Sequence, residues 1–223
     1  ANWADGLVPE TGDTVVFDAT ANSDCRWDLN IQPGSWTQTV DFAGTVTFAT
    51  TYGDALPFVE VLGDVVLNGG TWTHLANGGL NRTYRLYVKV GGDMTVDANA
   101  KVTAYALGYQ QQYMAKGGTF SGTKIYATHG GFGYENTVTW PLGGNGAVPY
   151  GKIRAPEEPG SGSNSTSYLG GGAIRLDVAG LLTIDGKIDA NALEHKNYTG
   201  AGGSVYLRAG TIAGSGSVTA DSL

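Results

Sequence analysis

Apolar and polar residues alternate along several short stretches of the chain. Apolar side chains take every second position within 86–90, 174–178 and 205–207. A period of two is that of a β-strand with one buried face. Stretches such as "DTVVFDA", "GTVTFAT" and "GTWTHL" in the first third have the same character, and turn residues separate them. No stretch of useful length has the 3.6-residue period of an amphipathic helix, so the sequence predicts short strands joined by tight turns.

Three hexapeptides repeat one pattern. "VTAYAL" (102–107), "IDANAL" (188–193) and "VTADSL" (218–223) each begin with a β-branched residue and have Ala third and Leu sixth. Repetition of whole strand-like units at a fixed period is typical of architectures in which similar units stack on one another. The sequence therefore predicts that the three hexapeptides occupy equivalent places in the fold.

A glycine marks a common point upstream in each unit. Gly63 and Gly92 are 29 residues apart, and Gly180 and Gly210 are 30 apart. The separation of 88 between Gly92 and Gly180 equals one unit of about 30 residues plus an insertion of nearly 60. We place this insertion at residues 108–169.

The predicted fold is all-β, a right-handed parallel β-helix (β-solenoid). Units of this length with several short strands cannot bury their own apolar faces and must stack. An antiparallel β-sandwich or jelly roll stays open as the alternative, because strand spacing alone fits both. We expect one domain over residues 1–223, interrupted by the aromatic- and Gly-rich insertion.

Composition narrows the class of protein and of partner. Glycine accounts for 36 of the 223 residues, only 15% are charged, and the net charge is −7. An acidic chain of this kind is a poor partner for nucleic acid or for an anionic membrane surface. No apolar run approaches the roughly 20 residues of a membrane helix. The single cysteine, Cys25, excludes an internal disulfide, and we read it as a small core residue or, alternatively, a reactive thiol. The scarcity of lysine favours an extracellular or surface protein.

The opening segment "ANWADGLVPETGDTVVFD" resembles the first turn of bacterial secreted β-helix surface proteins of the adhesin and autotransporter-passenger type. The residues that carry the likeness are Asn2, Trp3, Pro9, Gly12 and Asp13. The stretches "GGGAIRLDVAGLLTIDGKIDANA" and "GAGGSVYLRAGTIAGSGSVTA" are similar to the repeats of that class. The resemblance implies a secreted β-helix with a structural or adhesive role. Polysaccharide-active enzymes share this architecture, so the fold does not choose between activities.

Aromatic residues interleaved with glycine make the insertion the candidate binding surface. Long excursions from a repeat unit are where stacked-repeat proteins carry ligand sites. Aromatic faces could stack against sugar rings, which makes polysaccharide a candidate partner. The alternative is a satellite core that holds the insertion onto the fold. The candidate residues are Tyr109, Tyr113, Phe132, Tyr134, Trp140 and Tyr150.

No cofactor is predicted, and calcium is the only metal with candidate ligands. Residues 130–138, "GGFGYENTV", nearly match a calcium-binding nonapeptide, with Glu135 in place of Asp. Such turns normally occur in tandem and share each ion, whereas this chain has one imperfect copy. Glu157 and Glu158 could also offer oxygen ligands, although the sequence favours the simpler interpretation of a solvated acidic turn.

Catalytic signatures are missing from the sequence. The three histidines, His74, His129 and His195, are scattered, and neither a Gly-x-Ser-x-Gly elbow nor a His-Glu-x-x-His pair is present. We therefore predict that the chain is not an enzyme.

Two pairs of polar residues recur at equivalent repeat positions and could form an acid pair across neighbouring units. These are Asp97 with Asp185, and Asn191 with Asp221. The adjacent Gly and Asn favour the simpler interpretation that they cap turns.

The last hexapeptide still follows the repeat when the sequence stops. A stacked-repeat fold without a cap exposes its core and its unpaired strand edges. We therefore expect end-to-end self-association, or further turns in a longer chain. The predicted function is a non-catalytic extracellular structural or adhesive building block that assembles into a filament or continues in a longer surface protein. A carbohydrate-binding module that uses the insertion's aromatics is the first alternative, and a polysaccharide lyase or hydrolase is the second.

Overall fold

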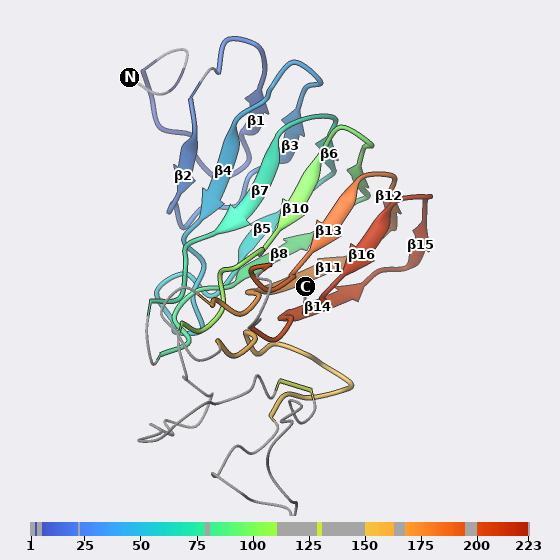
Figure 1. Cartoon of the computed structure of the whole chain (residues 1–223). Helices are drawn as coiled ribbons and strands as arrows, with labels where there is room; N and C mark the ends of the chain where they lie inside the picture. The colour runs from blue at the N-terminus through green and yellow to red at the C-terminus, as the bar shows by residue number, and fades with distance from the viewer. Residues whose placement is uncertain are drawn as a thin grey trace, which may run out of the picture.

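Short strands make up almost all of the regular structure. The computed structural model describes residues 3, 6–21, 23–78, 81–110, 129–130, 150–162, 168–194 and 200–222, and within these ranges it has sixteen strands and no helix (Figure 1). The strands are β1 (Thr14–Phe17), β2 (Cys25–Trp27), β3 (Ser35–Gln38), β4 (Thr45–Phe48), β5 (Val59–Val61), β6 (Val65–Leu67), β7 (Thr71–His74), β8 (Leu86–Val90), β9 (Met94–Val96), β10 (Lys101–Thr103), β11 (Ala173–Val178), β12 (Leu181–Ile184), β13 (Lys187–Asp189), β14 (Ser204–Arg208), β15 (Thr211–Ala213) and β16 (Ser217–Thr219).

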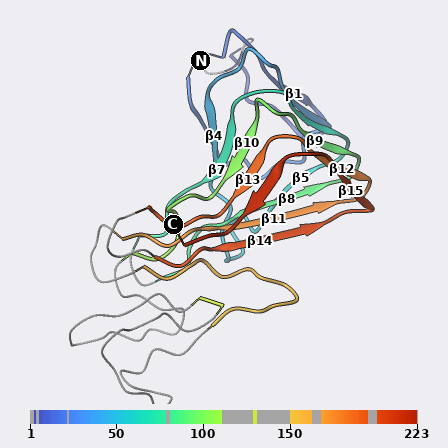
Figure 2. The same cartoon turned by 45° about the vertical axis from the view of Figure 1, so that its right-hand side comes forward.

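The strands form three parallel sheets, which the chain visits in a fixed order. The first sheet runs β1-β3-β6-β9-β12-β15, the second β2-β4-β7-β10-β13-β16, and the third β5-β8-β11-β14. From β3 onward each strand belongs to the next sheet in turn, so the chain winds around a common interior (Figure 2). All pairings between these strands are parallel. This arrangement is compatible with a parallel β-helix or solenoid, whereas the alternative sandwich or jelly roll needs antiparallel neighbours.

The repeat found in the sequence corresponds to one turn of this winding. Val102 pairs with Ile188, and Ile188 pairs with Val218, so the three hexapeptides stack as predicted. The inserted segment 108–169 falls between β10 and β11, which belong to consecutive turns. The described strands on either side of it therefore continue the same three sheets.

The marker glycines lie one above another and hydrogen-bond in sequence. The N–H of Gly92 donates to the carbonyl of Gly63 at 3.1 Å, that of Gly180 to Gly92 at 3.0 Å, and that of Gly210 to Gly180 at 2.9 Å. A Cβ on Gly180 would lie 2.0 Å from Oδ1 of Asp93, so no larger residue fits beside that carboxylate. The period of 29–30 residues thus reflects direct contact between turns.

Aspartates next to the glycines link each turn to the following one. Oδ1 of Asp64 accepts the N–H of Asp93 at 2.8 Å, and Oδ1 of Asp93 accepts the N–H of Leu181 at 2.8 Å. Backbone N–H groups at the corners between sheets need acceptors of this kind, because no strand partner reaches them. These carboxylates therefore act as structural caps.

Inward-facing side chains form columns that run across the strands. In one such column, on the second sheet, the four middle side chains are fully buried and the side chains at its two ends are partly exposed. Burying each aliphatic side chain contributes about 1.5–3 kcal/mol. This column, called the Cys25–Val218 column below, consists of Cys25, Val46, Trp72, Val102, Ile188 and Val218.

The interior of the first turns is mainly aromatic. The ring centroids of Trp36 and Trp72 are 5.4 Å apart at 89°, and those of Trp27 and Trp36 are 4.7 Å apart at 65°. Such edge-to-face pairs contribute about 0.5–1.5 kcal/mol beyond the burial of their area. Among the described residues, none of these three indole N–H groups has a hydrogen-bond partner, so the stacked rings themselves must offset that cost.

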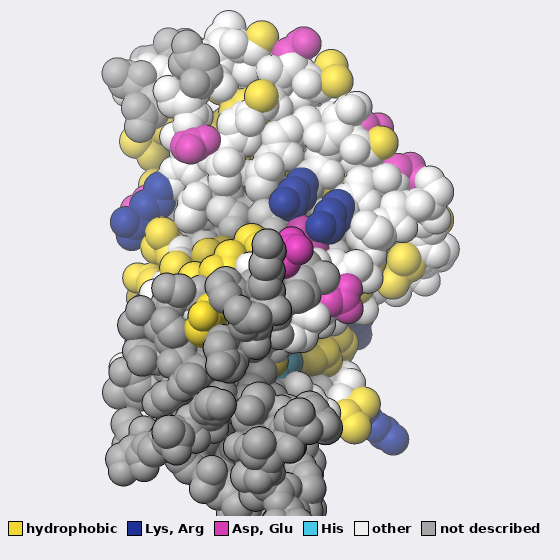
Figure 3. Space-filling view, in the orientation of Figure 1, with side chains coloured by type: hydrophobic (Ala, Val, Ile, Leu, Met, Phe, Trp, Pro, Cys, Tyr) yellow, Lys and Arg dark blue, Asp and Glu magenta, His cyan; other side chains and the backbone are white. Residues whose placement is uncertain are grey.

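The outer face of the second sheet is rich in threonine. Thr45 and Thr71 share one outward register position, and Thr47, Thr73 and Thr103 follow along another. Most of the side chains on this face, which is turned to the viewer in Figure 3, are neither hydrophobic nor charged. Threonine suits such positions because its β-branched side chain favours strands while its hydroxyl remains hydrated.

His74 holds the chain where it re-enters the fold after the insertion. Nε2 accepts the N–H of Ala173 at 3.3 Å, which leaves the proton on Nδ1, where it donates to the carbonyl of Leu75 at 2.8 Å. The ring is 1% exposed. Burial lowers the pKa of His74 from 6.5 to about 4, so the imidazole is neutral at neutral pH.

We predict that His74 makes the protein less stable in mild acid. A histidine whose pKa is lower in the folded state contributes fully above pH 6.5, and this contribution declines as the pH falls toward 4. The free energy of unfolding, measured in urea between pH 7 and 4, should therefore decline more steeply for the wild type than for His74→Gln, which cannot protonate. Equal slopes for the two proteins would contradict this assignment.

Candidate functional site

The structure describes two of the six aromatic residues predicted to bind a ligand. Tyr109 and Tyr150 lie together, with ring centroids 6.3 Å apart, and the Tyr150 hydroxyl donates to the carbonyl of Pro159 at 2.6 Å. Tyr109 is 1% exposed, and burial raises its pKa to about 12. A ring enclosed in this way offers no face to a sugar, so Tyr109 behaves as part of a satellite core, whereas Tyr150 is only partly buried. Tyr113, Phe132, Tyr134 and Trp140 lie outside the described residues.

The predicted calcium ligands Glu157 and Glu158 are engaged by arginines. Oε1 of Glu157 lies 2.6 Å from Nη1 of Arg175, and Oε2 lies 3.7 Å from Nη1 of Arg85. Glu158 forms an ion pair with Arg82. Glu135 lies outside the described residues, and the described part of the chain has no group of three or more His, Cys, Asp or Glu side chains placed to hold a metal ion.

Two of these arginines, Arg85 and Arg175, stack on Tyr87 of the third sheet. The guanidinium carbon of Arg85 lies 4.8 Å from the ring centroid of Tyr87, and that of Arg175 lies 4.5 Å from it. The Tyr87 hydroxyl donates to Oδ2 of Asp177 at 2.8 Å. Burial, reinforced by this hydrogen bond, raises the pKa of Tyr87 to about 12. Cation–π contacts and charge-assisted hydrogen bonds are strong when partly desolvated, so this cluster attaches segment 156–158 to the sheet.

A second polar cluster surrounds a buried carboxylate on the second sheet. Asp189 is 1% exposed, and the hydroxyl of Thr103 donates to its Oδ1 at 3.1 Å. Nζ of Lys187 and Nζ of Lys101 lie 3.4 and 3.7 Å from its Oδ2. Burying an ionised group requires opposite charges and hydrogen bonds of this kind. Thr103, Lys187 and Lys101 therefore stabilise the buried charge of Asp189.

The polar pairs considered for acid catalysis serve as caps. Oδ1 of Asp185 accepts the N–H of Ser215 at 2.9 Å, and Oδ1 of Asn191 accepts the N–H of Asp221 at 2.7 Å. Asp97 accepts the N–H two residues further along at 3.1 Å. The capping interpretation is confirmed for these three side chains.

The structure describes two of the three histidines, of which His74 is buried and His129 is partly buried. His74 is enclosed and neutral, as described above. His129 lies in the satellite core, where its Nδ1 is 2.7 Å from the carbonyl of Gly202 and its ring centroid is 5.0 Å from that of Tyr150. Burial lowers its pKa. His195 lies outside the described residues.

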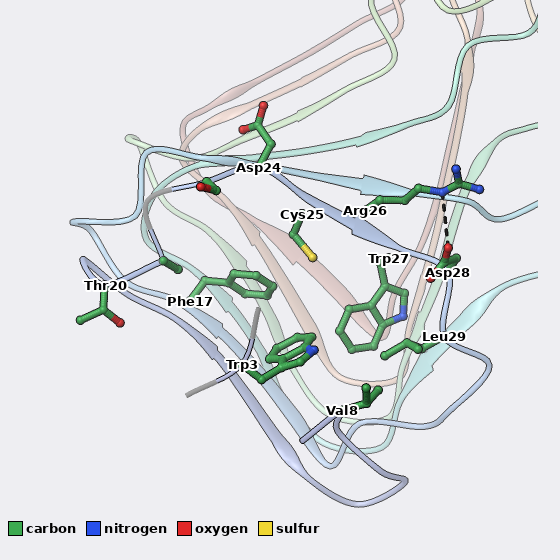
Figure 4. A pocket seen from close by; sticks show the side chains of 12 residues that line it. Trp3, Val8, Phe17, Thr20, Asp24, Cys25, Arg26, Trp27, Asp28 and Leu29 are labelled. Atoms are coloured by element: carbon green, nitrogen blue, oxygen red, sulfur yellow. Dashed lines mark ion pairs between the residues drawn. The ribbon is translucent and has the colours of Figure 1, made fainter. Parts of the chain in front are cut away.

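A hollow lies at the end of the fold that carries β1 and β2. Its volume is about 430 Å³, and its walls include the side chains of Trp3, Phe17, Cys25 and Trp27 (Figure 4). Trp3 packs edge-on against Trp27 at 6.2 Å between ring centroids and covers part of the interior. The half-buried Cys25 points its Sγ into the hollow, and burial raises the pKa of the thiol, with Asp28 adding to the shift. A protonated thiol is a poor nucleophile, so Cys25 belongs with the apolar walls.

The opposite end of the fold exposes core positions. β14, β15 and β16 are the terminal strands of the three sheets. Ile212 is 53% exposed and Val218 is 47% exposed, although their neighbours Leu182 and Ile188, one turn back, are fully buried. Ile212 and Val218 are therefore exposed because no further turn among the described residues covers their side chains.

Comparison of the chain with family models, with curated proteins and with solved structures finds no significant match. In the part of the chain that the structure describes, no helix could span a membrane. The resemblance to bacterial β-helix surface proteins stays a sequence-based hypothesis. Among the described residues, the edge formed by β14, β15 and β16 is thus the feature that most directly indicates a partner.

We predict that Arg175 stabilises the fold through its contacts with Glu157, Asp177 and Tyr87. Arg175→Gln leaves Glu157 and Asp177 without their strongest partner, and we expect a loss of about 1–3 kcal/mol in the free energy of unfolding. Arg208→Gln is the matched control, because Arg208 is exposed at the end of β14 and should change stability by less than about 0.5 kcal/mol. Urea unfolding of the three proteins measures both effects. Similar losses for the two variants would show that Arg175 has no special role.

Proposed function

We propose that the chain is a non-catalytic structural or adhesive building block of an extracellular, cell-surface β-solenoid. In this proposal the winding is a right-handed parallel β-helix, since connections between parallel strands of one sheet are almost always right-handed. The partner is a second copy of the chain, stacked end to end. The single observation that carries the proposal is that core columns are open at the end formed by β14, β15 and β16, where Ile212 and Val218 are half-exposed.

The edge formed by β14, β15 and β16 supports this partner. The half-exposed Ile212 and Val218 continue columns that are fully buried one turn earlier. The outer edges of these strands also present backbone N–H and C=O groups that a further parallel strand could pair with. A second copy stacked on this edge would bury the apolar side chains and would also pair with the free backbone groups.

The hollow beside β1 and β2 is the matching surface. Cys25, Trp27 and Phe17 line it, and two of them begin inward columns of the second sheet. If the next copy continues the Cys25–Val218 column in register, Val218 of one copy lies beside Cys25 of the other, about 4.8 Å away between strands. Aromatic walls at one end and half-exposed aliphatic side chains at the other are complementary in chemistry.

Stacking of this kind produces a filament. The two surfaces are different, so the contact is heterologous and does not close on itself. Six strands in the first and second sheets correspond to an axial repeat of roughly 29 Å per copy, at ~4.8 Å between strands. The regular, threonine-rich outer face of the second sheet suits a structural or adhesive role. The extracellular location is supported by composition and by the sequence resemblance alone.

We predict that a charge at the end of the column prevents assembly. Val218→Lys would bury a lysine at the interface, which is costly without a partner, and should leave the protein monomeric. Ser217→Lys changes the neighbouring outward position of the same strand and should assemble like the wild type. Sedimentation velocity across a concentration series measures association, and electron microscopy measures the axial repeat. A wild type that stays monomeric at every concentration would overturn the proposal, as would unchanged assembly of Val218→Lys.

A cross-linking experiment tests the register. Cys25 is the only cysteine, so Val218→Cys should form disulfides between copies under mild oxidation and give a ladder of covalent oligomers. Ser217→Cys points outward and should not form the ladder, and Val218→Cys combined with Cys25→Ser should form none beyond dimers. If Ser217→Cys cross-links as efficiently as Val218→Cys, the proposed register is wrong.

A further inference from the structure

The two ends of the winding differ in how well their outermost core side chains are covered. β1 and β2 are the terminal strands of the first and second sheets at one end, and β15 and β16 at the other. In β1 and β2, Phe17 is 5% exposed and Trp27 is 1% exposed. In β15 and β16, Ile212 is 53% exposed and Val218 is 47% exposed. Something other than a neighbouring strand therefore covers the first end.

The side chain that covers the first end is Trp3. Its ring centroid lies 6.1 Å from that of Phe17 and 6.2 Å from that of Trp27, at interplanar angles of 59° and 88°. Figure 4 shows its indole between these two rings, at the hollow that they line. Trp3 belongs to the segment that precedes β1, and the N–H of Gly6 donates to its carbonyl at 2.9 Å. The first end is therefore capped by the chain's own N-terminal segment.

This cap covers the end incompletely. Trp3 is itself only partly buried, and Val8, which also lines the hollow, is 57% exposed. The hollow of about 430 Å³ remains beside the cap, and Cys25 points its Sγ into it (Figure 4). Protein interiors rarely leave spaces much larger than one water molecule. The contact made by Trp3 is thus less well packed than the core that it covers.

Trp3 lies where a stacked copy would place its own side chains. In the register proposed for stacking, Val218 of one copy lies beside Cys25 of the other. The same register brings Ala220 beside Trp27, since each of these residues comes two positions later in its strand. A strand docked in this way lies about 4.8 Å from β2, and its inward side chains fill the next layer of the interior. The Trp3 ring occupies that layer, so the two cannot be there together.

We infer that Trp3 is an autoinhibitory cap that a second copy must displace before it stacks. The inference rests on the proposed end-to-end stacking and adds a restraint to it. The first end accepts a partner only in the fraction of molecules whose cap is open, so the apparent dissociation constant equals the intrinsic one divided by that fraction. The cap therefore raises the concentration at which filaments form, while the edge of β14, β15 and β16 stays available.

Removal of the cap tests the inference. Sedimentation velocity should show that Trp3→Ala associates at about tenfold lower concentration than the wild type, as expected if about one wild-type molecule in ten is uncapped. Trp3→Phe keeps a smaller ring in place and should fall between the two, which keeps the test valid if Trp3→Ala folds poorly. Leu7→Ala is the matched control, because Leu7 lies in the same segment, is 74% exposed and does not line the hollow. It should associate like the wild type.

A second substitution at the opposite end separates stacking from non-specific aggregation. Trp3→Ala exposes aromatic rings, and exposed apolar surface can aggregate without any register. Trp3→Ala combined with Val218→Lys should be monomeric, because the charge blocks the edge that the uncapped end must meet. If the double variant associates as readily as Trp3→Ala, the gain comes from non-specific contact and the inference is wrong.

The thiol of Cys25 reports on the cap independently of assembly. It is the only cysteine, and its Sγ faces the hollow beside Trp3. At concentrations where every protein is monomeric, a neutral maleimide should label Trp3→Ala about tenfold faster than the wild type or Leu7→Ala, because labelling follows the uncapped fraction. In assembled samples the thiol should be protected, since Val218 of the next copy lies against it.

The outcomes distinguish the cap from the stacking on which it depends. Equal labelling of Trp3→Ala and the wild type would show that Trp3 does not restrict access to the first end, and would overturn the inference. Faster labelling without easier association, while the wild type still forms filaments, would also overturn it and would leave the stacking proposal intact. Failure of both the wild type and Trp3→Ala to associate at any concentration would overturn the stacking itself.

Discussion

The strand register between successive turns is the constraint on which the rest of the structure depends. A strand of three to six residues pairs its backbone only with the strands one turn before and after it, and it buries its apolar side chains against the other two sheets. A slip of one residue would turn every inward side chain outward. The stacked glycines and the capping aspartates hold this register at the corners, where the sheets themselves cannot. Columns of like residues on the inner and outer faces follow directly from it.

Much of the winding could be read from the sequence, because its physical causes are local and recur. Alternation with a period of two identifies strands, and the spacing of Gly63, Gly92, Gly180 and Gly210 identifies the turn length. Parallel pairing was not accessible from strand spacing alone, since an antiparallel sandwich has strands of the same length. It became evident only from which residues lie opposite one another, such as Val102 and Ile188.

The candidate sites were harder to predict from the sequence than the fold, for two different reasons. Aromatic and glycine-rich composition is the same for a ligand platform and for a satellite core, and only the burial of Tyr109 separates them. Glu157 and Glu158 form ion pairs with Arg85 and Arg82, which lie 72 and 76 residues upstream, and Glu157 also pairs with Arg175 on the strand that follows the insertion. No repeat in the sequence connects these positions. The column of Tyr87, Arg175 and Tyr206 on the outer face of the third sheet, in contrast, left a signal: "LYVKV", "IRLDV" and "VYLRA" align once the polar positions of the repeat are compared as well as the apolar ones.

The contact between His74 and Ala173 has a consequence for how this chain can vary. His74 Nε2 takes up the first strand N–H after the insertion, and the N–H of Gly172 donates to the carbonyl of Ala104 at 2.7 Å, just before the insertion begins. The two ends of segment 108–169 are thus clasped together by the fold itself. Closing a loop costs free energy that grows only with the logarithm of its length, and doubling the length adds about 0.6 kcal/mol. The clasp therefore makes this corner a natural acceptor for grafted sequences of very different sizes.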